Sequence, residues 1–219
     1  MAQLQRINPD WSSEPCIVAA PGPSLTADVV RKCRMARWLR GWRIIAVQDA
    51  YKLMPFADAM YGCDVKWWSL HKNCAGFTGE KWSTHEDDRD RDQDKLSIAD
   101  EYGLRCVRGM DGDEFSFDPE VIRYVSNSGA QAIGLALLKG CRRIVLVGFD
   151  MRSVDGKQHF FGDHPAPMHN RTDYEVFIPH FERAAATLPD EVRIVNATPD
   201  SALRCWPMMD LEAALAEDF

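Results

Sequence analysis

The stretch VSNSGAQAIGLALLKGCRRIVLVGFD, at residues 125–150, decides the fold. Asn127 or Ser128 can cap a helix there, because a side-chain oxygen at the cap accepts one of the free N–H groups of the first turn. The helix that follows is rich in Ala, Leu and Ile, and Gly140 supplies a left-handed stop. The next apolar run is continuous rather than alternating, which is typical of a strand covered on both faces. The stretch therefore predicts an α/β fold.

Short apolar runs elsewhere predict the remaining strands. They lie at residues 16–20, 43–47, 59–62, 104–108 and 192–195. Helical patterns follow the first run, where Thr26 or Ser24 can cap, and also occupy residues 172–188 and 209–216. We expect a mostly parallel sheet with helices on both faces. With no repeat and no linker in sight, residues 1–219 are interpreted as a single Rossmann-like nucleotide-binding domain.

Two segments break this regular pattern. A polar loop is expected near residues 76–95, since EDDRDRDQD at its end has too little apolar content to join a core. A His-rich loop is expected at residues 151–171, which hold His159, His164 and His169. Long irregular segments in compact domains are usually functional or disordered. The aromatic and histidine content of the second loop favours function.

Composition excludes several classes of protein. The net charge of −7 and the pI near 5.4 argue against general binding to nucleic acid. No signal peptide and no run long enough for a membrane span is apparent. The seven scattered cysteines contain no CxxC pair, which favours a reduced, cytoplasmic setting and makes a zinc site improbable. Scattered tryptophans are expected in the core, although some could serve a homo-oligomer interface.

The ligand is expected where strands end and the following helices begin, because in a parallel sheet these points share one edge. Small, polar or acidic residues fall there in this sequence. They are Gly22, Pro23, Ser24, Gln48, Asp49, Asp64, Asn127, Ser128, Gly129, Gly148 and Asp150. Two helix N-termini at this edge would direct N–H groups at a ligand, so a phosphate-bearing molecule is the expected ligand.

The acidic residues of this edge and the histidines leave two interpretations open. Asp49, Asp64 and Asp150 could hold a ribose hydroxyl or a divalent metal, or they could cap turns. A neutral imidazole near pH 7 can accept a proton from a hydroxyl group, so a histidine of the His-rich loop is a candidate general base. Each histidine taken singly is more often a surface or hydrogen-bonding residue.

Three short motifs add a resemblance to known families. They are GPSL at residues 22–25, the SG-to-GFD segment at 128–150, and His169 before Thr172-Asp173. This pattern resembles the bacterial sialyltransferases of glycosyltransferase family 42, the motility accessory factor glycosyltransferases, and archaeal 6-hydroxymethylpterin diphosphokinase. The resemblance implies a Rossmann-like domain and a nucleotide or nucleotide-sugar ligand.

The resemblance also implies roles for particular residues. His169 would be the general base, and the GPS turn with Ser128 and Gly129 would contact the nucleotide. Two features depart from the sialyltransferase pattern: Gln48 stands where that family has Asn, and no tyrosine lies within residues 145–151. Both departures bear on the sialyl donor more than on the fold.

Three functions follow as hypotheses. The leading one is a transferase that uses a nucleotide-activated sugar and requires no other cofactor, with His169 or His164 and Asp150 as the catalytic residues and a glycan or small molecule as acceptor. The second is a magnesium-dependent diphosphokinase-like enzyme that uses ATP, in which Asp64 and Asp150 would hold the metal. The third is a nucleotide-binding or assembly protein without catalysis.

Overall fold

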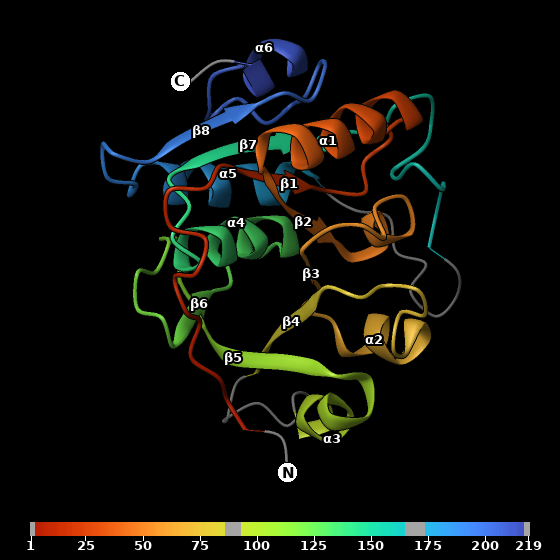
Figure 1. Cartoon of the computed structure of the whole chain (residues 1–219), viewed down its shortest axis with the longest axis vertical. Coiled ribbons are helices and arrows are strands. Elements are labelled where there is room, and N and C mark those ends of the chain that lie inside the picture. Colours follow the sequence, from red (N-terminus) through yellow and green to blue (C-terminus); the bar gives the residue numbers. More distant parts are fainter. Residues whose placement is uncertain (1–2, 86–92, 165–173, 217–219) are drawn as a thin grey trace.

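The computed structural model describes residues 3–85, 93–164 and 174–216. Its described strands form one sheet in the order β6-β5-β4-β3-β2-β1-β7-β8, and every pairing in it is parallel (Figure 1). The strands are β1 (Cys16–Ala19), β2 (Arg43–Val47), β3 (Ala59–Tyr61), β4 (Glu80–His85), β5 (Leu104–Met110), β6 (Val121–Arg123), β7 (Arg143–Val147) and β8 (Arg193–Asn196). The predicted α/β class is confirmed.

Helices cover both faces of the sheet, as predicted. They are α1 (Ala27–Arg40), the 3-10 helix η1 (Gln48–Lys52), α2 (Val65–His71), α3 (Gln93–Tyr102), α4 (Ser128–Leu138), α5 (Tyr174–Ala185) and α6 (Leu211–Ala216). Buried side chains of α4 and α5 belong to one apolar cluster, and those of α1, α2, α3 and α6 belong to another. The sheet separates these two cores, which explains its continuous apolar strands.

The central stretch forms the elements that its sequence predicts. Asn127 caps α4, because its Oδ1 accepts a hydrogen bond of 2.7 Å from the Gly129 N–H. Gly140 ends the helix with φ of +99°. Every α4 residue after Ser128 is buried, so this helix fills the space between β1, β2 and β6 rather than lying on the surface.

Strand order reverses between β1 and β7. The chain adds β2 to β6 on one side of β1, then returns through α4 to place β7 and β8 on the other side. In sheets of this kind the carboxyl ends of the two strands at the reversal diverge and leave a crevice. The Pro21 turn after β1 and Gly148 after β7 meet at this point.

The prediction of a polar loop near residues 76–95 was wrong in part. Glu80–His85 is strand β4, and Gln93 begins α3, while residues 86–92 lie outside the described residues. The strand was missed because its sequence, EKWSTH, is largely polar. Its first residue, Glu80, accepts hydrogen bonds from Arg105 and from the indole N–H of Trp82, and it pairs with the buried Lys139 at 2.8 Å.

Strand β6 was also missed. It has only three residues and follows a turn-rich segment, so it carries too little periodicity to be recognised. The expectation that tryptophans lie in the core was wrong for Trp38, which is 83% exposed, and is confirmed for the others. Trp67 and Trp68 are completely buried in an edge-to-face pair, with ring centroids 4.9 Å apart.

Candidate functional site

Hydrogen bonds to Asp150 link the turn after β1 to the end of β7. Its Oδ2 accepts hydrogen bonds from the backbone N–H of Ser24 at 3.2 Å and from the Ser24 hydroxyl at 2.7 Å. The Gly22 N–H also donates to the Gly148 carbonyl at 3.1 Å. Thr26, rather than Ser24, caps α1. The predicted residues of these two segments therefore lie together, and burial raises the pKa of Asp150 above its ordinary value despite the bonds from Ser24.

Three glycines allow this close approach. A Cβ atom at Gly22 would lie 2.1 Å from Asp150 Oδ2, and one at Gly148 would lie 2.1 Å from the Ala20 carbonyl oxygen. Gly129 packs against the Phe149 ring, where a Cβ would be 2.7 Å from a ring carbon. Close packing therefore accounts for all three glycines, against backbone at Gly22 and Gly148 and against side chains at Gly22 and Gly129.

Strained backbone gathers at the same edge of the sheet. Gln48, Val125, Ser126 and Met151 all have φ between +43° and +49°, and Gly148 has +73°. A β-branched residue such as Val125 is a genuine outlier in this region. Strain of this kind costs on the order of 1–3 kcal/mol per residue and clusters at functional sites. The observation supports a functional role for this edge.

Asp49 lies beneath the surface at the end of β2, with 1% of the residue exposed. Its Oδ2 accepts a hydrogen bond of 2.7 Å from the Trp67 indole N–H. Its Oδ1 is 2.5 Å from Lys52 Nζ and 3.5 Å from His71 Nε2. Burial alone would raise the pKa of Asp49, but the bonds from Lys52 and Trp67 outweigh it and lower the pKa. The geometry gives this carboxylate a positioning role toward Lys52 and His71.

The described part of the His-rich loop, residues 151–164, folds back onto this edge. The Phe160 N–H donates to the Pro21 carbonyl at 3.0 Å, which ties the loop to the turn after β1. Lys52 Nζ lies 5.6 Å from the centre of the Phe161 ring. The ring of His164 lies 4.7 Å from that of His159. The loop thus brings two imidazoles beside the Asp49–Lys52 pair.

These imidazoles are neutral at physiological pH. Burial lowers the pKa of His159 to about 4, and it also lowers the pKa values of His164 and His71. Asp49 opposes the shift at all three rings. A neutral imidazole held beside a cation is able to accept a proton. His169, the base that the resemblance implies, lies outside the described residues.

The remaining predicted residues occupy the neighbouring strand ends. Asp64 caps α2, with its Oδ1 accepting from the Lys66 N–H at 3.1 Å. The Ser128 hydroxyl lies 3.2 Å from Cys63 Sγ, so the start of α4 touches the end of β3. Across the described residues no three His, Cys, Asp or Glu side chains converge in a group suited to a metal ion.

Several residues of the site escaped the sequence analysis. Lys52 and His71 carry no motif of their own, although Lys52 stands three residues after Asp49 on one helical turn. Beneath the edge, the buried Tyr61 hydroxyl donates to Gln131 Oε1 at 2.7 Å, and Gln131 Nε2 donates to the Tyr124 carbonyl at 2.7 Å. Only the fold brings these groups from separate strands and helices together.

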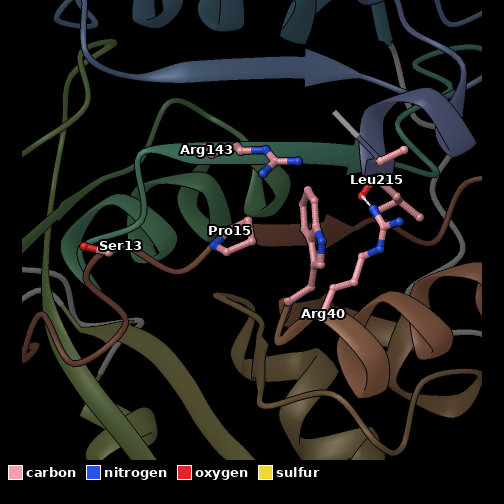
Figure 2. Close-up of a pocket in the computed structure, with 7 residues that line it drawn as sticks. Ser13, Pro15, Arg40, Arg143 and Leu215 are labelled. Atoms are coloured by element: carbon pink, nitrogen blue, oxygen red, sulfur yellow. Dashed lines mark hydrogen bonds between the residues drawn. The ribbon is translucent and has the colours of Figure 1, made fainter. Parts of the chain in front are cut away.

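A cavity of about 270 Å³ lies at the opposite, amino-terminal edge of the sheet. Figure 2 shows Arg40 and Arg143 on its wall with Trp42, beside the end of α6. Arg40 donates to the Leu215 carbonyl at 2.8 Å, and the Arg143 guanidinium stacks on Trp42 at 4.7 Å. Both arginines donate to carbonyl groups near the carboxyl end of α6, where the helix dipole favours cations. The positions of Arg40 and Arg143 in this cavity therefore have a structural explanation.

Among the described helices, none has the length and apolar content needed to cross a bilayer.

Comparison with known proteins gives similarity at the level of structure. No protein-family model matches the sequence, and no curated protein sequence does so. The structure is similar to that of the MAf glycosyltransferase from Magnetospirillum magneticum AMB-1, with a TM-score of 0.65 and 12% sequence identity. The alignment covers 97% of this chain and 36% of that one, so the chain spans about a third of the length of this neighbour. At this identity the similarity shows a shared fold.

Proposed function

We propose that this chain is a glycosyltransferase domain that uses a nucleotide-activated sugar. One observation carries the proposal: the His-rich loop is fastened across the edge where strand order reverses, and it places imidazoles beside the Asp49–Lys52 pair. The fold shared with a glycosyltransferase supports the same function. Whether the sugar is a sialic acid is left to experiment.

The nucleotide is proposed to lie in the crevice between β1 and β7. There the N-termini of α1 and α4 favour a phosphate group through their helix dipoles. Lys52 adds a cation beside Phe161 and the imidazoles of the loop. Lys52 pairs with Asp49, which holds its ammonium group in place. Because 45% of the Lys52 side chain is exposed, that group can also contact a ligand.

The reaction then needs one proton transfer and one displacement. A loop histidine, His164 or His169, removes the proton from an acceptor hydroxyl, whose oxygen attacks the anomeric carbon of the donor. The bond from that carbon to the phosphate oxygen breaks, and the nucleotide leaves with the bonding electrons. Lys52 and the helix N-termini stabilise the charge that develops on the leaving phosphate.

Nucleotide binding is the first test. Thermal unfolding would be followed with CMP, UDP, GDP and ATP, each with and without magnesium. A ligand at a hundred times its Kd adds about 2.7 kcal/mol to the free energy of unfolding, which is an easily measured rise in Tm. A rise with one nucleotide without metal supports the proposal. A rise with ATP alone that needs magnesium would favour a diphosphokinase-like enzyme, and no rise at all would favour a protein without nucleotide chemistry.

Variants of the loop and of Lys52 test the mechanism. With the donor that binds, Lys52→Met should lower kcat/KM by about a hundredfold or more. His164→Ala and His169→Ala identify the base, because the essential histidine should contribute about 10²–10⁴-fold to the rate. His180→Ala is the matched control, since His180, on α5, pairs with Asp113 and not with the site. If His164→Ala and His169→Ala both kept full turnover, neither histidine would be the general base.

A further inference from the structure

The outer face of α1 is unusually apolar for a surface that touches water. We define it as Arg31, Arg34, Met35, Trp38 and Leu39, which share one side of the helix at spacings of three and four residues. Trp38 is 83% exposed, Leu39 66% and Met35 46%. The opposite side of α1 packs on the sheet through Cys33 and Ala36 (Figure 1).

Trp38 differs from every other tryptophan of the protein. The remaining six are at most 6% exposed. Large apolar side chains grouped on a surface mark contact sites for proteins or membranes. Tryptophan in particular prefers positions where an apolar body meets water, as at a membrane interface.

The charge of α1 is opposite to that of the whole chain. The helix holds five basic residues and one acidic residue, whereas the protein has a net charge of −7. The acidic residue, Asp28, already pairs with Arg31 at 2.6 Å and with Lys32 at 2.8 Å. Arg34 lies over the Phe56 ring at 5.3 Å, so its cation stays at the surface. Lys32 also pairs with Glu212 at 2.8 Å, and Arg37 pairs with Asp58 at 2.8 Å. The outer face therefore combines exposed apolar groups with the positive charge of Arg34 and of Arg31, which shares Asp28 with Lys32.

We propose that the outer face of α1 binds the surface of an anionic lipid bilayer. Surface-lying helices combine Trp and Leu side chains, which enter the headgroup region, with Arg or Lys side chains, which meet lipid phosphates. α1 has 14 residues and keeps its inner side on the sheet, so only Met35, Trp38 and Leu39 would enter the lipid. The inference does not depend on the proposed glycosyltransferase activity.

A second copy of the chain fits this face less well. In a symmetric dimer the same surface meets itself. The outer face would then place Arg31 and Arg34 of one copy against the arginines of the other, with only the already paired Asp28 to compensate. Like charges opposed in this way disfavour the contact.

Trp38 provides its own reporter for the test. Because the other six tryptophans are buried, iodide or acrylamide should quench mainly Trp38. Vesicles of phosphatidylcholine with phosphatidylglycerol should protect Trp38 from the quencher and shift its emission to the blue. Vesicles of phosphatidylcholine alone should do neither, and added salt should reverse the protection.

Matched variants separate charge from apolar contact. Arg31→Gln with Arg34→Gln should weaken vesicle binding about 25-fold, at about fivefold for each cation near an anionic surface. Met35→Ser with Leu39→Ser keeps the reporter and should also weaken binding, and circular dichroism checks that both variants fold. Unchanged quenching with anionic vesicles would overturn the proposal. Protection that grows with protein concentration, with a dimer in sedimentation, would assign the face to a second copy, and equal protection by polyglutamate would assign it to an acidic protein.

Discussion

At the amino-terminal edge of the sheet, Asp58 accepts hydrogen bonds from Arg37, from Arg43 and from the backbone N–H of Ile44. At the carboxyl-terminal edge, the side chain of Asp150 accepts hydrogen bonds from the backbone N–H and the hydroxyl of Ser24. The first aspartate joins two arginines and a strand in one network. The second is buried with a raised pKa and fastens one turn beside the crevice.

The two edges therefore serve different purposes. The amino-terminal edge is built from arginines that satisfy carboxylates and the last carbonyls of α6. At the carboxyl-terminal edge, Gln48, Val125, Ser126 and Met151 have left-handed backbone, whereas Ser13 has it beside the cavity at the amino-terminal edge. The carboxyl-terminal edge also holds imidazoles whose pKa values burial lowers. An edge whose charged groups are paired contributes stability. An edge with strained backbone and shifted pKa values is the expected place for chemistry.

The largest expected effect separates two glycines with the same backbone conformation. Gly148 at the carboxyl-terminal edge has φ of +73°, and Gly41 near the amino-terminal edge has +71°. A Cβ would lie 2.1 Å from the Ala20 carbonyl oxygen at Gly148, but it would meet nothing within 4 Å at Gly41. Gly41→Ala should cost about 1 kcal/mol, the price of a left-handed alanine. Gly148→Ala should cost about 4 kcal/mol or more, because backbone must also move.

Urea unfolding of both glycine variants measures this difference. Equal losses of stability would mean that conformation alone explains Gly148, and the close approach of β1 and β7 would then carry no special cost.

Asp58 and Asp150 should also differ in their contribution to stability. Asp58→Ala should lower the free energy of unfolding by about 3 kcal/mol, because it leaves Arg37 and the Ile44 N–H without this acceptor and leaves Arg43 with Glu14 alone. Asp150→Ala should cost about 1–2 kcal/mol, since it removes bonds from one serine and relieves a buried charge. Chemical denaturation at pH 7 would rank them, and the reverse order would contradict the contrast between the edges.

Acid should destabilise the carboxyl-terminal edge through its histidines. The folded-state pKa of His159 is about 4, against 6.5 in the unfolded chain, so the unfolded state binds a proton first as the pH falls. The contribution is fully present above about pH 6.5 and is lost down to pH 4, at about 1.4 kcal/mol per unit or about 3 kcal/mol in total. Denaturation of the wild type and of His159→Gln across this range would measure it, and parallel curves would show that His159 contributes nothing.

The smallest effect belongs to the cavity at the amino-terminal edge. Arg40→Gln removes one hydrogen bond to the Leu215 carbonyl and should cost about 1 kcal/mol of stability. Nucleotide binding should not change, because the carboxyl-terminal edge lies at the other end of the strands. A Tm measured with and without nucleotide tests both statements, and lost binding would move the site toward Arg40.

The sequence alone determined the class of fold, and it predicted the edge at which we propose that the ligand binds. Continuous apolar runs predicted parallel strands, and Asn127 with Gly140 set the bounds of α4, since capping and periodicity are local properties that short stretches reveal. The placement of the turn after β1 and of Gly148 on one edge also followed from strand ends, whereas their direct contact required the strand order of the folded sheet. Strand β4 did not follow, because polar residues such as Glu80 join a sheet only when partners from other elements satisfy them.

Only the tertiary structure decided how the edge is equipped. Asp49 was expected to touch a ligand, yet the fold surrounds it with Trp67, Lys52 and His71. The shifted pKa values of His159 and His164 arise from burial where their loop packs against this edge, which no local pattern encodes. The outer face of α1, with Trp38 in water, appears only when the inner side of the helix is known. Contacts between residues distant in sequence depend on the whole sheet, so they are settled by folding and not by any single stretch.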